Sequence, residues 1–292
     1  QLKLFVLDLK TGNLARKIST GIGNAFGSSL YNATLDTDRG AQLSSGNYRD
    51  DVVYIGYTKC ADAVCTSSST WTKGGVLRLN TKEDPDPAQW SISLVIDEVG
   101  PVTAAISKLQ DRKNGRLWLY FGTGRYFYKM GTSIDDPGNA TDSTTVRRLY
   151  GIQEPCYSST TNDIDNTCYA SVSTGSLLDQ SNNPSLDIGT ATGWYINLDT
   201  PNSGYLQERL ITDPLAVFSG VVFFTTYSPS ADICAVGGNT YVWAVNYKSG
   251  GQASGLTGKA LVQVSTGEIR ELDLSNSLTG RNNRRSGAVI GV

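Results

Sequence analysis

The sequence contains no histidine, and this absence excludes several classes of function. Without histidine there is no Ser-His-Asp or Cys-His catalytic relay, no histidine-ligated haem, zinc or copper, and no histidine pH switch. Charged residues are sparse as well, at 18% against the roughly 25% usual for soluble domains. The formal net charge of -2 argues against nucleic-acid binding, which needs a basic face. No apolar run approaches the roughly 20 residues that span a bilayer, so we expect no membrane span.

Glycine and tyrosine are abundant instead, with 31 Gly and 15 Tyr among 292 residues. Together with the low charge, this composition is typical of many short strands joined by tight turns. Apolar runs closed by polar or glycine turns predict strands, whereas helical periodicity is nearly absent. The predicted strands are Leu4–Leu9, Val52–Gly56, Gly75–Asn80, Ser91–Ile96, Arg116–Gly122, Arg147–Ile152, Trp194–Asp199, Gly220–Thr226, Tyr241–Asn246, Ala260–Val264, Glu268–Leu272 and Gly287–Val292.

Imperfect strand repeats at irregular spacing favour an all-β fold, and specifically a β-propeller with irregular or incomplete blades. The strands suffice for about four or five blades, since a blade has four strands. Polar insertions at 39–49, 60–71, 134–143 and 157–187 account for the irregular spacing. A β-sandwich or a β-helix is the alternative. We expect residues 1–292 to form a single propeller domain, with the insertions as its recognition loops.

The five cysteines form an odd set. Cys60 and Cys65 bracket one short polar loop, and Cys156 and Cys168 bracket another. Such loops bury little apolar surface, so a local disulfide in each favours an oxidising compartment. Five free thiols in a cytoplasmic protein are the alternative, whereas the spacings fit a zinc site poorly. Cys234 is left buried and free, or paired with a segment outside this chain.

An Asp-Thr-Asp sequence at Asp36–Asp38, followed by Asp50 and Asp51, is the most specific candidate site. Carboxylates at alternate positions of a loop lie on one side of it, and Ca²⁺ takes six to eight such oxygen ligands. An acidic turn capped by its own aspartates is the alternative interpretation. A second acidic stretch, Asp163–Asn166, also has a cation-loop pattern, but we interpret it as part of a solvent-facing insertion.

Other motifs indicate structure more than chemistry. The glycines of Gly122-Thr123-Gly124 lack the third glycine and the following helix of a dinucleotide site, so we interpret them as a strand bend beside a close backbone. The tryptophans are expected to pack in the blade cores, apart from Trp71 in its polar loop. Carboxylates at 97–98, 135–136 and 213 are candidates for the acid and base of a glycosidase. Adjacent residues of a strand point to opposite faces, however, so neighbouring carboxylates would not face one substrate together.

Several segments in one order resemble PilY-type pilus-tip proteins. The clearest runs from Gly100-Pro101-Val102-Thr103 to the sequence FGTGRY at 121–126, which is similar to a P-I-T…F-G-T-G-R-Y segment of that family. The further matching segments are 149–152, 207–209, 221–229 with 232–234, and 262–267. The matches extend from about residue 4 to residue 292, so the resemblance covers essentially the whole chain.

The resemblance implies the C-terminal β-propeller domain of a larger protein at the tip of type IV pili. It also implies a Ca²⁺ loop in which Asp36, Asp38 and Asp51 match ligand positions, with Asp50 as a substitute for Asp51. The segment 39–50 is longer than the spacer in the family, and Tyr57 stands where the family usually has an aspartate. The longer segment predicts weaker binding, since a longer loop costs more to order.

We therefore expect a non-enzymatic, extracellular adhesin that supports fimbrium biogenesis, surface adhesion and twitching motility. The implied partners are minor pilins, the N-terminal remainder of its own protein, and a host or abiotic surface, and the implied route is secretion through the periplasm and outer membrane. Two enzymatic alternatives stay open. One is a propeller glycosidase that uses carboxylates alone, and the other is a quinoprotein-like propeller suggested by the Val6–Gly12 blade edge.

Overall fold

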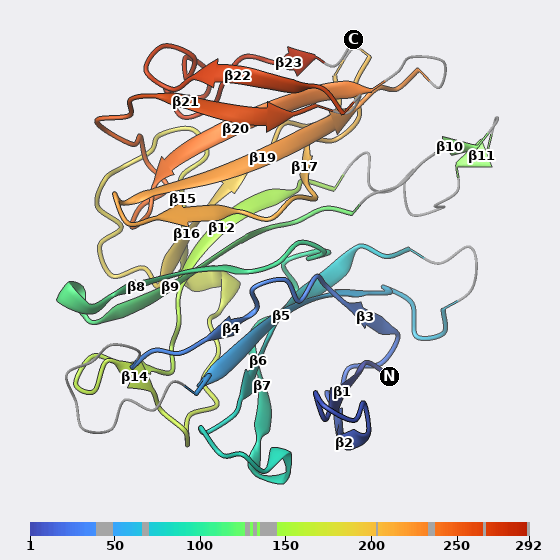
Figure 1. Ribbon diagram of the computed structural model, residues 1–292. Helices are drawn as coiled ribbons and strands as arrows, with labels where there is room; N and C mark the ends of the chain where they lie inside the picture. The colour runs from blue at the N-terminus through green and yellow to red at the C-terminus, as the bar shows by residue number, and fades with distance from the viewer. Residues whose placement is uncertain are drawn as a thin grey trace.

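The fold was derived from a computed structural model, which describes residues 1–38, 49–65, 70–125, 129–130, 133–134, 145–202, 204–232, 237–264 and 267–290. Nearly all of its regular structure is β-strand, as predicted (Figure 1). The described helices are single 3₁₀ turns, η1 (Pro87–Gln89), η2 (Arg112–Asn114) and η3 (Thr174–Ser176). No described helix has the length and apolar character needed to cross a membrane.

Three five-stranded sheets follow one another along the chain, and each contains a four-stranded antiparallel meander in chain order. The first sheet consists of β3 (Ala25–Gly27), β5 (Val52–Lys59), β6 (Lys73–Asn80) and β7 (Ser91–Ile96), with β4 (Thr34–Leu35) beside β5. The second consists of β8 (Ser107–Asp111), β9 (Arg116–Gly122), β12 (Arg148–Gln153) and β16 (Gly193–Asn197), with β15 (Leu177–Asp179) parallel to β16. The third consists of β17 (Arg209–Leu210), β19 (Val221–Pro229), β20 (Gly238–Asn246) and β23 (Val289–Ile290), with β18 (Leu215–Val217) beside β19.

Two-stranded hairpins are attached to these meanders. They are β1 (Lys3–Leu7) with β2 (Leu14–Ser19), β10 (Lys129–Met130) with β11 (Ser133–Ile134), β13 (Tyr157–Ser158) with β14 (Asp163–Ile164), and β21 (Lys259–Gln263) with β22 (Ile269–Asp273). Every strand predicted from the sequence overlaps an observed strand, either in a meander or in a hairpin. The described meanders number three instead of the expected four or five blades, because some predicted strands belong to hairpins.

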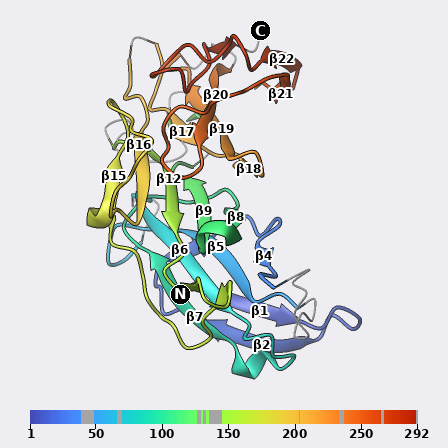
Figure 2. The same ribbon diagram turned by 90° about the vertical axis from the view of Figure 1, so that its left-hand side faces the viewer.

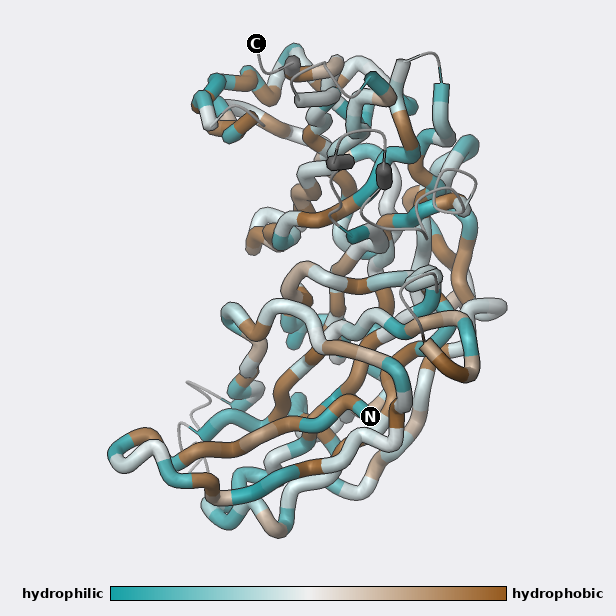
Figure 3. Tube along the Cα trace, turned by 90° about the vertical axis from the view of Figure 1, so that its right-hand side faces the viewer, coloured by the Kyte–Doolittle hydropathy of each residue, from teal (hydrophilic) through white to brown (hydrophobic). Residues whose placement is uncertain are grey.

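The three sheets stack face to face from the first to the third (Figure 2). Strand β9 shows why, since its side chains alternate between two cores. Leu117 and Phe121 contribute to the core toward the first sheet, whereas Trp118 and Tyr120 contribute to the core toward the third. A strand with both faces covered needs a continuous apolar sequence, and hydrophobic residues follow such strands through the stack (Figure 3).

The two interfaces between sheets differ in composition. Aliphatic side chains such as Val52, Val76 and Ile152 dominate between the first and second sheets. Between the second and third sheets Trp118, Trp194 and Trp243 are buried together, as the sequence predicted for the tryptophans. On the outer face of the first sheet, the β1–β2 hairpin covers a third, smaller core.

Trp194 lies in a slot between two glycines. A Cβ atom on Gly151 would lie 2.4 Å from the Trp194 ring, and one on Gly250 would lie 2.6 Å from it. Neither glycine can therefore gain a side chain without moving the indole. The predicted close approach at Gly122 and Gly124 is also confirmed, since Cβ atoms there would lie 2.5 Å from the Leu210 side chain and 2.8 Å from its carbonyl oxygen.

All-β architecture is thus confirmed. The described sheets form an open stack and not a closed ring, so the propeller stays a prediction.

Candidate functional site

The candidate calcium segment lies where the first sheet meets the second. Asp36 and Asp38 follow β4 and flank the buried Thr37. The backbone N–H of Thr37 donates to Oδ2 of Asp51 at 2.5 Å, and its hydroxyl lies 2.7 Å from the same oxygen. The hydroxyl also lies 2.5 Å from Oδ1 of Asp163. Because a hydroxyl carries one hydrogen, it can donate to only one of these two carboxylates at a time.

Three carboxylates converge at this point, and we call Asp51, Glu83 and Asp163 the acidic cluster. One oxygen of each lies within 4.8 Å of the others. Asp51 immediately precedes β5, Glu83 lies in the turn after β6, and Asp163 is in β14, so three segments build the cluster. The pKa of Asp51 is raised to about 7, mainly by burial and to a smaller extent by the charge of Asp163, while the hydrogen bonds from Thr37 oppose the rise.

The second sheet holds the Thr37 segment in place. The side chain of Gln110 donates to the Thr37 carbonyl at 2.8 Å and to the Asn162 carbonyl at 3.0 Å. Arg112 donates to the Thr37 carbonyl at 2.5 Å. The segment after β4 is therefore fixed to both the second sheet and the β13–β14 hairpin.

The sequence anticipated this site only in part. Of its four aspartates, Asp51 belongs to the acidic cluster, whereas Asp36 and Asp38 do not. Asp50 is exposed, and its carbonyl accepts a hydrogen bond from the Thr81 hydroxyl. Residues 39–48, the interior of the predicted loop, lie outside the described residues.

Glu83 and Asp163 are the members that sequence reasoning missed. The interpretation of Asp163–Asn166 as a solvent-facing insertion is wrong at its first two residues. Ile164 is buried in the core between the first and second sheets, and this anchors Asp163 next to Thr37. The buried Ile164 between two aspartates was the signal that could have identified it.

The structure contains both predicted disulfides. Cys60 and Cys65 join across a Cα–Cα distance of 6.4 Å, and Cys156 and Cys168 across 5.5 Å. The second disulfide encloses the β13–β14 hairpin that carries Asp163. Cys234 lies outside the described residues.

A fully buried ion pair supports the same hairpin. Arg78 of β6 donates to Oε1 of Glu154 at 2.6 Å, and neither side chain is exposed. The same Glu154 oxygen accepts the backbone N–H of Cys156 at 2.9 Å. Arg78 also donates to the Ala170 carbonyl at 3.0 Å, so it joins the first sheet to both ends of the disulfide-bonded segment.

The carboxylates considered for a glycosidase have structural contacts in the described residues. Asp97 accepts the Tyr57 hydroxyl, and Asp213 accepts the backbone N–H of Ala105 at 2.7 Å. Glu98 forms an exposed ion pair with Lys73 at 3.2 Å. Asp135 and Asp136 lie outside the described residues.

Comparison with known proteins bears on these features. No protein-family model matches the chain. A protein named "Type IV pilus biogenesis factor PilY1 homolog", from Xylella fastidiosa (strain Temecula1), is 28% identical over 287 residues, which cover 86% of this chain and 17% of the relative. A second PilY1 homolog from the same strain is 28% identical over 159 residues, which cover 52% of this chain and 12% of the relative. The resemblance to PilY-type proteins is confirmed.

The fold has a counterpart among solved structures. The crystal structure of the Pseudomonas aeruginosa PilY1 C-terminal domain superposes with a TM-score of 0.51 and 16% sequence identity, covering 94% of this chain and 65% of that domain. At this identity the match shows a shared fold. The chain thus resembles the C-terminal domain of PilY1 and spans about a sixth of the length of the first PilY1 homolog.

Proposed function

We propose that this chain is a non-enzymatic module of type IV pilus biogenesis, located at the pilus tip in the C-terminal part of a longer PilY-type protein. The observation that carries the proposal is the similarity to a PilY1 homolog over 86% of the chain, together with the shared fold of the PilY1 C-terminal domain. Surface adhesion and twitching motility follow as the processes that such a module would support.

The proposed action is mechanical. The three meanders correspond to successive blades of a β-propeller, which the remainder of the longer protein would complete. Stacked sheets with dry cores give a rigid body, and loops on a rigid body can bind partners without loss of the core. The proposed partners are minor pilins, the N-terminal remainder of the protein, and a host or abiotic surface.

The two disulfides support an extracellular location. Disulfides persist in oxidising compartments such as the periplasm and the cell surface. The Cys156–Cys168 bond also keeps the β13–β14 hairpin closed, which would matter for a protein under pulling force.

The location and partners can be tested in the native host. Pili sheared from the cells are purified, and the fraction is probed for this protein and for minor pilins. The proposal expects the protein in the pilus fraction, and expects antibodies against it to capture minor pilins. Recovery of the protein only from the cytoplasm, or from pilus-free fractions, would contradict the proposal.

A bound Ca²⁺ ion is the second part of the proposal. Ca²⁺ coordinates oxygens at about 2.3–2.6 Å, so two ligands of one ion lie at most about 5 Å apart, and the 4.8 Å limit of the acidic cluster fits this requirement. Asp51 would be a ligand together with Glu83 and Asp163, and Asp36, Asp38 and Asp50 remain the candidates from the loop. A cation there would stabilise the charged form of Asp51 against the burial that mainly raises its pKa and against the repulsion from Asp163.

The cation site predicts a change in melting temperature. Millimolar Ca²⁺ should raise the melting temperature, because a ligand of the native state adds about 2.7 kcal/mol at a hundredfold excess over its Kd. Asp51→Asn keeps an acceptor for Thr37 but removes the charge, so it should abolish the shift. Asp62→Asn, an exposed aspartate in the Cys60–Cys65 loop, is the matched control and should behave as wild type. A wild-type melting temperature that is equal with Ca²⁺ and with chelator would contradict the site.

A further inference from the structure

The loop between Gly280 and Arg285 has an unusual backbone. Arg281, Asn282 and Asn283 have φ values of 49°, 62° and 57°, so three consecutive non-glycine residues are left-handed. The carbonyl of Gly280 accepts the N–H groups of Arg284 at 3.1 Å and Arg285 at 3.0 Å, which closes the loop. Asparagine adopts the left-handed conformation as a single residue, whereas several consecutive left-handed residues are rare. Such strain persists only where the surroundings impose it, and it is concentrated at functional sites.

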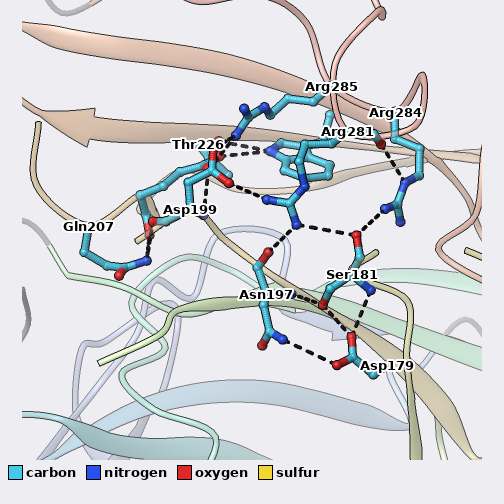
Figure 4. A network of polar contacts seen from close by, with 11 residues as sticks. Asp179, Ser181, Asn197, Asp199, Gln207, Thr226, Arg281, Arg284 and Arg285 are labelled. Atoms are coloured by element: carbon cyan, nitrogen blue, oxygen red, sulfur yellow. Dashed lines mark hydrogen bonds and ion pairs between the residues drawn. The ribbon is translucent and has the colours of Figure 1, made fainter. Parts of the chain in front are cut away.

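A buried arginine imposes part of this conformation. Arg284 is fully buried and donates to the carbonyls of Gln180 at 2.7 Å, Gly250 at 2.9 Å and Ser181 at 2.9 Å. Gln180 and Ser181 follow β15 of the second sheet and Gly250 follows β20 of the third, so the loop is fixed to both. Figure 4 shows the contact of Arg284 with Ser181.

The neighbouring arginines are neutralised within the protein. Arg281 forms an ion pair with Asp199, and Arg285 pairs with Asp199 at 2.6 Å and with Glu208 at 2.8 Å. Both guanidinium groups also lie over the Trp243 ring, at 5.5 and 5.4 Å from its centroid. The charges of Arg281 and Arg285 are thus balanced by carboxylates of the protein itself. The two asparagines of the loop, Asn282 and Asn283, are exposed.

An open groove of about 800 Å³ adjoins the exposed asparagines. Asn282 and Asn283 form one wall, and the segments 183–186 and 252–254 form the others. A second hollow of about 610 Å³ shares residues 252–254 and Asn283 with it and extends along 274–279. The described residues lining the two hollows include no charged side chain, and most of them carry amide or hydroxyl groups.

We propose that this groove binds a neutral oligosaccharide. Amide side chains offer both donors and acceptors, as the hydroxyl groups of an uncharged sugar require. An anionic glycan, a phosphate or a nucleic acid would need a cation that the described lining lacks. Leu186, which is 69% exposed, and Pro184 provide a small apolar surface for the C–H face of a sugar ring. The fixed backbone reduces the ordering cost of binding.

The inference rests on the adhesive part of the proposed function for its biological meaning, and its test is independent of pili. The native protein is screened against an array of neutral, sialylated and sulfated glycans, and the strongest neutral binder is then titrated by calorimetry. Asn283→Asp and Gln252→Glu add a negative charge to the groove with little change in size, and each should weaken binding at least tenfold. Asn32→Asp is the matched control, because Asn32 is also exposed and left-handed (φ 47°) but lies outside the groove, and it should change the affinity less than twofold.

Each result decides the inference. Binding of neutral glycans that the groove variants weaken and the control does not, at wild-type melting temperatures, supports it. No neutral binding at millimolar glycan, a preference for sialylated or sulfated glycans, or equal effects of all three variants would overturn it. The wild-type protein is also screened against neutral peptides, and binding of these without neutral glycans would overturn it too. If glycan binding is found but the protein is absent from pili, the proposed function fails and this inference stands.

Discussion

The two interfaces between neighbouring sheets differ in the charge of the side chains at their edges. Carboxylates cluster at the first interface, and arginines cluster at the second. Between the first and second sheets, an aliphatic core ends in the acidic cluster, where Asp51 has a raised pKa. Between the second and third sheets, a tryptophan-rich core ends in the 280–285 loop, whose arginines contact carboxylates and carbonyls of the protein itself. The first interface is the one at which we propose an external cation, whereas the second contains its own cationic side chains. The three sheets share one strand topology, but the side chains that hold neighbouring sheets together differ between the two interfaces.

The largest effect is expected from breaking the buried ion pair of the first interface. Glu154→Gln leaves Arg78 buried without its counter-charge, which typically costs about 3–5 kcal/mol. Urea unfolding of the variant measures this loss. The double variant Arg78→Met/Glu154→Leu removes both charges and should recover most of the stability. A single variant within 1 kcal/mol of wild type would show that the pair does not hold the interface.

A smaller loss is expected when the tryptophan slot of the second interface is filled. Gly151→Ala places a methyl group 2.4 Å from the Trp194 ring, and overpacking of this kind costs about 1–3 kcal/mol. The signal is a lower midpoint of urea unfolding and altered tryptophan fluorescence. Gly23→Ala is the control, because no atom lies within 4 Å of its Cβ position and its φ is ordinary. If the two substitutions lowered the midpoint of urea unfolding equally, Gly151 would not be closely packed against Trp194.

The smallest effect is a pH dependence of stability at the first interface, where Lys108 donates to the Thr34 carbonyl at 3.1 Å. Burial lowers the pKa of Lys108, in β8, from 10.5 to about 8, while the charge of Asp50 opposes this. Between pH 8 and 10.5 the unfolded chain binds more protons at this lysine than the folded one, so stability rises with pH. The difference in unfolding free energy between wild type and Lys108→Met should therefore increase across this range. A difference independent of pH would show that Lys108 is not buried as described.

The strands could be predicted wherever burial on both faces imposes a long apolar run, as in β9 and β19. The shorter strands β3, β17 and β18 were missed, because two or three residues carry no periodicity. Their places are determined by pairing with long neighbours.

The candidate site was predicted at Asp51 and missed elsewhere for a different reason. Asp51, Glu83 and Asp163 are far apart in sequence, and only the stacking of the first two sheets brings them together. The 280–285 loop was also missed, although the Asn-Asn pair after Gly280-Arg281 was an available signal for positive φ.

Pilus formation in the native host tests the central claim of a non-catalytic scaffold most directly. A strain lacking the gene is complemented with the wild-type protein, with Asp97→Asn, with Asp213→Asn or with Glu154→Gln, and surface pili are counted. We predict that folded Asp97→Asn and Asp213→Asn proteins restore wild-type numbers of pili, and that Glu154→Gln restores them only in proportion to its folded fraction. A carboxylate variant with wild-type stability and abundance but without pili would contradict the account, because it would point to a reaction at that carboxylate.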